Sequence, residues 1–215
     1  YAGLNAAVDG CARALRARGV APDERVLVMV PPGIPLITLF YGLLRMGAVP
    51  VMIDPGMGFQ AFLKCVATTE ATSLVGIPKA HVARLLFPRA FSTVRRRFVV
   101  GPSPLGLLGE RLDPFAKGAP DATSPREEKR PDDLAAILFT SGSTGEPKGT
   151  LATRRRWAEE MCVEVDFWPY VGASFQPSAI AGDRGSVWRA LTNGGRVGFA
   201  RRGAELFHDI RQLRL

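Results

Sequence analysis

A run of small, hydroxyl-bearing residues with one lysine has the clearest chemistry in this sequence. It follows the apolar run 135–139 and reads Thr140-Ser141-Gly142-Ser143-Thr144-Gly145-Glu146-Pro147-Lys148-Gly149. Glycines at 142, 145 and 149 allow tight backbone bends, so successive N–H groups can converge on an anion. The hydroxyl groups add hydrogen-bond donors, and Lys148 adds a positive charge. The pattern predicts a phosphate-binding loop at the end of a buried strand, and we expect the phosphate to belong to a nucleotide.

Two common phosphate-binding motifs do not fit this chain. The nucleoside triphosphatase loop requires Gly-x4-Gly-Lys-Ser/Thr. Counted from Gly142, Pro147 stands where the second glycine should be, and Gly149 stands where Ser or Thr should follow the lysine. The dinucleotide fingerprint also fails, because 56–58 reads Gly-Met-Gly and no third glycine follows in 59–61. An ordinary polar surface loop is a weak alternative, since such loops rarely carry hydroxyls and lysine in this order.

Helices and strands alternate around the loop. The apolar spacing predicts strands at 25–30, 49–53, 73–76, 98–100, 135–139 and 197–200, with an extended segment at 163–168. It predicts helices at 4–15, 34–46, 59–69, 80–86, 155–162, 185–192 and 205–213. Such alternation predicts an α/β fold with a mainly parallel sheet flanked by helices. The segment 101–133 lies between the predicted elements that end at 100 and those that begin at 135. It is rich in Pro, Gly and charge, and we expect a surface linker there.

The composition limits the classes of function. The 215 residues are 47% hydrophobic, which is ample for a folded core, and the net charge is +8. A basic chain could suit nucleic acid or an anionic membrane surface. No aromatic interleaving or zinc-ligand spacing accompanies the arginines, so we expect solvated faces, affinity for anionic cofactors and no nucleic-acid partner. The arginine clusters are Arg95–Arg97, Arg154–Arg156 and Arg201–Arg202.

The cysteines and the hydropathy of the sequence indicate the cellular compartment of the protein. Cys11, Cys65 and Cys162 are odd in number and widely scattered, which indicates reduced thiols. No apolar stretch is long enough for a transmembrane helix, and no secretory leader is visible. We therefore expect a cytoplasmic protein.

Other chemically active side chains are better explained by packing. His81 and His208 are far apart and lie in no metal-ligand spacing. Cys65 lies on an apolar helix face, and core packing is the simplest role for the tryptophans at 157, 168 and 188. Asp54 precedes Pro55 and is interpreted as a turn residue. We assign no catalytic acid or base.

The complete loop pattern resembles the signature of the AMP-forming, adenylate-forming ligases, which include acyl-CoA synthetases, peptide-synthetase adenylation domains and luciferases. The segment 44–55 is similar to an earlier helix–turn–strand motif of that superfamily, in which Gly47 would end the helix. Its continuation at 56–58, with 77–81, is most similar to the β-lactone synthetases of olefin biosynthesis. The segments 177–184, 191–195 and 205–207 resemble carboxylic acid reductase and long-chain acyl-CoA synthetase adenylation domains. Ala179 stands where those families normally have a histidine facing the acyl pocket.

The resemblance implies a partial N-terminal AMP-binding (adenylation) domain over 1–215, the front half of that domain, without the C-terminal lid domain. It implies ATP-dependent activation of a carboxylic acid, of the medium or long-chain fatty or 3-hydroxy fatty type, to an acyl-AMP with release of pyrophosphate. ATP and Mg2+ would be required, and coenzyme A or a carrier-protein thiol is the acceptor it suggests. Thr140, Ser141, Gly142, Ser143, Thr144, Gly145 and Lys148 would bind the nucleotide, with Thr140 near Mg2+. The 215 residues alone are not expected to complete the reaction.

Two other classes of function remain open at this point. One is a non-catalytic nucleotide-binding or regulatory remnant of such a ligase, which Ala179 favours. The other is a basic nucleic-acid-binding protein, which only the net charge favours. The spacing of the loop residues favours the ligase over both.

Overall fold

The computed structural model describes residues 2–103, 106–114, 126–140, 148–162, 171–174 and 196–199. The helices are α1 (Ala2–Ala17), α2 (Ile34–Arg45), α3 (Phe59–Thr68), α4 (Pro78–Leu86) and α5 (Arg154–Cys162), with the 3-10 turn η1 (Pro55–Met57). The main strands are β1 (Arg25–Met29), β2 (Val49–Ile53), β3 (Ser73–Gly76), β4 (Arg96–Val99), β5 (Glu110–Arg111), β6 (Leu134–Thr140) and β7 (Lys148–Thr153). Two further strands are β8 (Val171–Ser174) and β9 (Arg196–Phe199).

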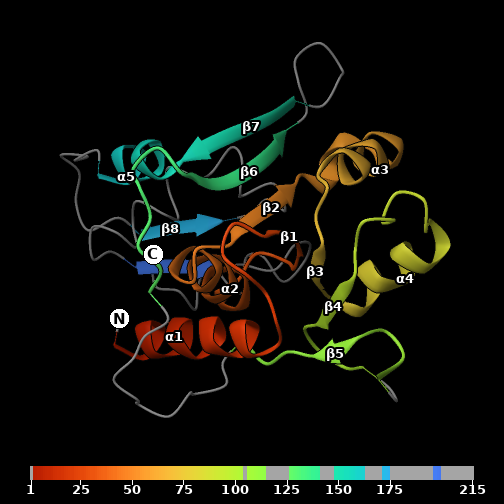
Figure 1. Cartoon of the computed structure of the whole chain (residues 1–215), viewed down its shortest axis with the longest axis horizontal. Coiled ribbons are helices and arrows are strands. Elements are labelled where there is room, and N and C mark those ends of the chain that lie inside the picture. Colours follow the sequence, from red (N-terminus) through yellow and green to blue (C-terminus); the bar gives the residue numbers. More distant parts are fainter. Residues whose placement is uncertain are drawn as a thin grey trace.

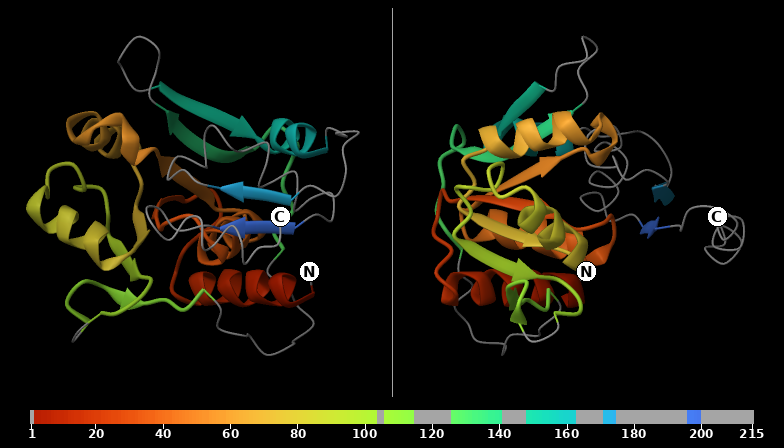
Figure 2. Two further views of the ribbon diagram at one scale, coloured as in Figure 1. Left: turned by 180° about the vertical axis from the view of Figure 1, so that it is seen from behind. Right: turned by 90° about the vertical axis from the view of Figure 1, so that its right-hand side faces the viewer.

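The main sheet has seven strands in the order β5-β4-β3-β1-β2-β6-β7 (Figure 1). Every neighbouring pair is parallel except β6 and β7, which are antiparallel. Strands β8 and β9 form a separate parallel pair outside this sheet (Figure 2). The predicted α/β class with a mainly parallel sheet is therefore confirmed. The predicted elements at 163–168, 185–192 and 205–213 lie outside the described residues, as do the side chains of Trp168, Trp188 and His208.

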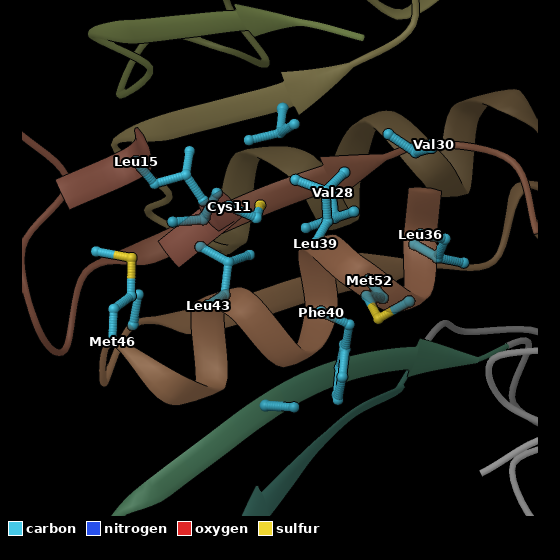
Figure 3. Close-up of a cluster of buried hydrophobic side chains, with 14 of the residues drawn as sticks. Cys11, Leu15, Val28, Val30, Leu36, Leu39, Phe40, Leu43, Met46 and Met52 are labelled. Atoms are coloured by element: carbon cyan, nitrogen blue, oxygen red, sulfur yellow. The ribbon is translucent and has the colours of Figure 1, made fainter. Parts of the chain in front are cut away.

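Helices cover both faces of the sheet because successive residues of each strand point to opposite sides. On β1, Val26 and Val28 join the core that α1 and α2 form, whereas Leu27 joins the core on the side of α3. Figure 3 shows the first of these cores, in which side chains of α2 lie between α1, β1 and β6. Helix α4 lies on the side of α3, since Ala80 packs directly against the backbone of Gly76. This burial on both faces explains why the strands are apolar throughout rather than alternating.

Gly47 ends α2 as predicted. It has φ +83°, and the N–H of Ala48 reaches back to the carbonyl of Leu43 at 2.9 Å, as in a Schellman cap. A Cβ at this position would lie 2.8 Å from the Lys129 side chain and 2.9 Å from Glu127. The segment that approaches β6 therefore packs against the cap, and only glycine satisfies both the backbone angle and the space.

The segment 101–133 is more structured than a surface linker in the parts that are described. Strand β5 pairs with β4, and Leu112 is buried while its N–H donates to the Val99 carbonyl at 2.9 Å. Near its end, Glu127 accepts from Arg16 at 2.7 Å, and Lys129 donates to Asp23 at 2.6 Å. No sequence pattern predicted β5, because a strand of two residues is too short to show a period.

Glu24 connects the amino ends of three strands, β1, β3 and β4. Its Oε1 accepts hydrogen bonds from Thr72 at 2.8 Å, Ser73 at 2.6 Å and Arg96 at 3.2 Å. Its Oε2 accepts from the N–H of Ala21 at 3.0 Å. Burial alone would raise the pKa of Glu24, but these hydrogen bonds and the charge of Arg96 lower it below the ordinary 4.5. The carboxylate is therefore stabilised in its ionised form.

Replacing Glu24 by Gln should lower the free energy of unfolding by about 1–3 kcal/mol at pH 7, because Arg96 loses its charged partner and a neutral amide accepts hydrogen bonds less strongly. The pKa in the folded state is the lower one, so the advantage of wild type over Glu24→Gln is complete above about pH 4.5 and lost as the pH falls further. Urea unfolding of both proteins over that pH range measures this difference.

The matched control is Glu70→Gln, since the Glu70 side chain is 73% exposed while bonded to Arg25. That change should cost less than about 0.5 kcal/mol. Equal losses in the two variants, or a Glu24 effect that persists at low pH, would contradict this role.

Candidate functional site

The phosphate-loop motif lies between two paired strands. Strand β6 ends at Thr140, β7 begins at Lys148, and these two residues are cross-strand partners. The motif therefore joins the ends of an antiparallel pair at the upper end of the sheet in Figure 1. Of the predicted nucleotide-binding residues, the structure places the backbone of Thr140 and the whole of Lys148, which is exposed. The predicted Ser141, Gly142, Ser143, Thr144 and Gly145 lie outside the described residues.

The pairing of β6 with β2 fixes the position of this loop. The two strands are parallel, with Ile53 opposite Phe139, and the N–H of Asp54 donates to the Phe139 carbonyl at 3.2 Å. Thr140 and Asp54 are therefore neighbours at the carboxyl end of the sheet. Open α/β sheets bind ligands outside the carboxyl ends of their strands.

Asp54 has the turn role that its sequence context predicts. Its Oδ1 accepts a hydrogen bond from the N–H of Gly56 at 2.8 Å, and η1 follows directly. Gly58 then adopts φ +86° before α3 begins, a backbone angle that suits glycine. The carboxylate thus organises the connection between β2 and α3.

Gly149 has a different role from the one predicted for it. The sequence suggested that it bends the loop, but it lies inside β7 opposite Phe139. A Cβ on Gly149 would approach the Phe139 ring to 3.0 Å, closer than side-chain contacts normally allow. A larger residue here would have to displace the Phe139 ring, which lies against the backbone of Gly149 next to Lys148. A strand of this composition shows no apolar alternation, which is why β7 was not predicted.

The remaining candidate side chains pack inside the protein. His81 is fully buried, with Nε2 3.0 Å from the Phe98 carbonyl; desolvation lowers its pKa below 6.5, and the charges of Arg84 and Arg97 act in the same direction. Burial raises the pKa of Cys11 to about 12 and also raises that of Cys65, so neither is an activated nucleophile. The structure confirms the packing roles expected for Cys65 and His81.

Trp157 is buried, and its ring lies 4.9 Å from that of Phe40 between centroids, so it is a core residue. Within the described residues there is no group of three or more His, Cys, Asp or Glu side chains that could hold a metal ion. In the same part of the chain, no helix is both long and apolar enough to cross a membrane.

The mainly parallel α/β fold and the sequence of the segment between β6 and β7 agree with the predicted superfamily, and comparison with known proteins supports it. The model of the AMP-binding enzyme family matches residues 1–215, so the chain belongs to that family. It is 39% identical over 166 residues to an olefin beta-lactone synthetase of Stenotrophomonas maltophilia strain K279a, covering 75% of this chain and 29% of the relative. It is 25% identical over 224 residues to a carboxylic acid reductase of Mycobacterium marinum, covering 91% of this chain and 19% of that protein.

A solved structure supports the same fold. The crystal structure of the N-terminal domain of FACL13 from Mycobacterium tuberculosis superimposes with a TM-score of 0.79 at 22% identity, covering all of this chain and 54% of that chain. The chain spans less than a third of the length of the first relative described above. The predicted superfamily is confirmed, and the similarity to olefin β-lactone synthetases and to carboxylic acid reductase is found as expected.

The turn role of Asp54 can be separated from ligand binding by two substitutions. Asp54→Ala should lower the free energy of unfolding by about 1 kcal/mol, because the N–H of Gly56 loses its acceptor. Asp54→Asn keeps an acceptor oxygen and should remain within about 0.5 kcal/mol of wild type. Urea unfolding measures both changes.

ATP affinity in the presence of Mg2+ provides the second readout for the same pair of variants. We expect it to be unchanged in Asp54→Asn. If that variant folds normally and yet binds the Mg2+–ATP complex much more weakly, the carboxylate is a ligand rather than a turn residue.

Proposed function

We propose that this domain binds ATP and activates a carboxylic acid to an acyl-AMP with release of pyrophosphate. The observation that carries the proposal is the position of the hydroxyl- and glycine-rich motif at the carboxyl end of β6, within a chain that belongs to the AMP-binding enzyme family. Family membership supports ATP-dependent activation of an acid in general. The reaction assigned to this protein is our proposal.

The chemistry explains why such a site contains no strong acid or base. A carboxylate attacks the α-phosphate while pyrophosphate leaves, so two anions must be brought together and aligned. Fixed hydrogen-bond donors and positive charge stabilise that arrangement better than a covalent nucleophile would. The N–H and hydroxyl groups of 140–145 would hold the departing β- and γ-phosphates, and Lys148 would neutralise part of their charge.

The position of Lys148 in the strand pair supports this proposed role. It is exposed at the first position of β7, opposite Thr140, and no acidic partner neutralises it among the described residues. Strand pairing fixes its backbone, whereas its long side chain can follow the phosphates as they leave. We expect its share of the rate to be modest, since one exposed charge acts beside several backbone donors.

Mg2+ would accompany ATP, and the donor chemistry at the strand end fits it. Mg2+ prefers oxygen ligands and usually keeps several waters while bridging phosphates. The hydroxyl of Thr140 is the oxygen that we propose for its shell. Bound there, the ion would supply charge neutralisation on the phosphates, while Thr140 and Lys148 orient the nucleotide.

The acid is proposed to be a medium or long-chain fatty acid or a 3-hydroxy fatty acid. The similarity to an olefin beta-lactone synthetase and to a carboxylic acid reductase supports a carboxylic acid substrate, and the fatty chain is our proposal. The acyl group would pass to coenzyme A, to a carrier-protein thiol or to a hydroxyl of the substrate itself. The alternative is a domain that binds the nucleotide without catalysis, and Ala179 at the usual histidine position favours it.

ATP–pyrophosphate exchange, measured on the intact protein as the cell makes it with a panel of carboxylic acids, tests the proposed reaction. Wild type should exchange only when a suitable acid is present, most strongly with long-chain acids. ATP binding without exchange across the panel would support the non-catalytic alternative.

Lys148→Ala should lower kcat/KM for exchange about tenfold, which corresponds to about 1.4 kcal/mol of lost transition-state stabilisation. The control is Arg89→Ala, which removes an exposed cation from the connection between α4 and β4; three strands separate β4 from β6, so exchange should stay within about twofold of wild type. An unchanged rate in Lys148→Ala would remove this residue from the site.

Thr140→Val keeps the size of the side chain and removes its hydroxyl. If Thr140 supplies oxygen to Mg2+, this variant should weaken Mg2+-dependent ATP binding severalfold, and Thr140→Ser should restore most of it. Isothermal titration at several Mg2+ concentrations measures both effects. Full Mg2+-dependent binding by Thr140→Val would refute the metal assignment.

A further inference from the structure

A second positively charged feature lies at the opposite edge of the sheet from the phosphate loop. A cavity of about 480 Å3 is lined by Arg95, Arg97 and Arg111, together with Ser103 and Glu110. It lies over β4 and β5, at the lower edge of the sheet in Figure 1. Three strands separate β4 from β6 in the sheet order, which at about 4.8 Å per strand places this cavity well over 15 Å from the β6–β7 junction.

The register of β4 and β5 places Arg97 and Arg111 on the same face of the sheet. Arg97 and Val99 point to the same face of β4, and Val99 pairs with Arg111 on β5. Glu110 pairs with Phe98 instead, and its carboxylate accepts a hydrogen bond from Arg18 on α1, which covers the other face. The loop before β5 crosses close to Arg97, because a Cβ on Gly109 would lie 2.6 Å from the Arg97 carbonyl. The cavity is therefore formed by this loop and the two strands.

The exposed arginines of the cavity have no carboxylate partner within the part of the chain that the structure describes. Among the residues that the structure describes, Arg95, Arg97 and Arg111 form no salt bridge, and the one acid in the lining is paired with Arg18. Most other arginines with described partners, such as Arg16 and Arg45, bind a carboxylate directly. A group of cations without counter-charge repels itself unless an anion joins it.

Arg84 of α4 supplies an independent observation, because it lies close enough to Arg97 of the cavity for the two charges to interact. Its Nε and Nη2 atoms are buried and have no hydrogen-bond partner among the described residues. Desolvation lowers the pKa of Arg84, and the neighbouring charge of Arg97 lowers it further. Buried guanidinium N–H groups are costly to leave unpaired, so Arg84, next to the exposed Arg97, indicates a place for an acceptor that the described protein groups do not provide.

We propose that this arginine-lined cavity binds the phosphate group of a phosphorylated ligand, at a site separate from the nucleotide loop. Guanidinium groups match the geometry of phosphate oxygens and form paired hydrogen bonds with them. Arg97 and Arg111 on adjacent strands would hold the phosphate, and Arg84 and Arg95 would add charge at its sides. The hydroxyl of Ser103 donates to the Gly109 carbonyl at 3.3 Å, so it holds the loop rather than the anion.

Nuclear magnetic resonance titration with pyrophosphate can detect binding at each arginine. We expect saturable shifts of the Nε–H signals of Arg84, Arg97 and Arg111 and of the backbone amides around β5. The amide signals at the β6–β7 junction detect binding at the nucleotide loop, so one experiment distinguishes the two sites. Shifts confined to the β6–β7 junction, or shifts at β5 that do not saturate by about 10 mM, would overturn the proposal.

Substitution then tests which charges matter. Arg97→Gln together with Arg111→Gln should weaken pyrophosphate binding at this site at least about tenfold. The control, Lys64→Gln together with Arg89→Gln, removes the same charge from exposed positions outside the cavity and should change affinity by less than about twofold. If the two double variants weaken pyrophosphate binding equally, the binding is general electrostatic attraction, and the proposal of a specific site is wrong. The amide spectrum of each variant confirms that it is folded.

A second probe identifies the source of the phosphate. Sedimentation with phosphatidylcholine vesicles containing phosphatidylglycerol tests a lipid headgroup. Vesicle binding that the Arg97/Arg111 double variant loses would assign the site to headgroups. Pyrophosphate binding without vesicle binding would assign it to a soluble phosphorylated compound. Absence of both would refute the site.

Discussion

The parallel pairing of β2 with β6 is the constraint on which the candidate site depends. These strands are far apart in the sequence, and their pairing brings the end of the 44–55 segment beside the start of the phosphate-loop motif. The hydrogen bond from the N–H of Asp54 to the Phe139 carbonyl continues the ladder to the last position before the loop. Without that pairing the motif would be a polar hairpin with no neighbour to define where its donors point.

The rest of the fold supports this pairing from both faces. Helix α2 places Phe40 against Trp157 of α5, so the helix that precedes β2 is packed against the helix that follows β7. Gly47 ends α2 where the chain that leads into β6 crosses over it, and the Arg45 carbonyl accepts from the N–H of Glu127 at 3.0 Å. Glu24 connects the amino ends of β1, β3 and β4. Polar contacts thus align the strands at their amino ends, while the carboxyl ends remain available for a ligand.

The sequence predicted the buried elements well and the edges of the sheet poorly. The bounds of β2 and β3 are those predicted, because an apolar run between turn residues is a strong signal. Strand β5 is too short to show a period, and β7 contains one buried side chain, Ala152, so pairing with a neighbour decides both. Residue types and spacing predicted the loop motif, but the contact between Phe139 and Gly149 depends on register, which no local pattern contains.

The central claim is that the phosphates of a nucleotide lie at the β6–β7 junction, and amide chemical shifts test it most directly. Titration of the isotope-labelled protein with ATP and Mg2+ should give saturable shifts at Thr140 and Lys148, with smaller ones at Asp54 across the β2–β6 ladder. Strand β3, which lies beyond β2 and β1 in the sheet order, should remain unchanged. Saturable shifts elsewhere, with Thr140 and Lys148 unaffected, would contradict the account.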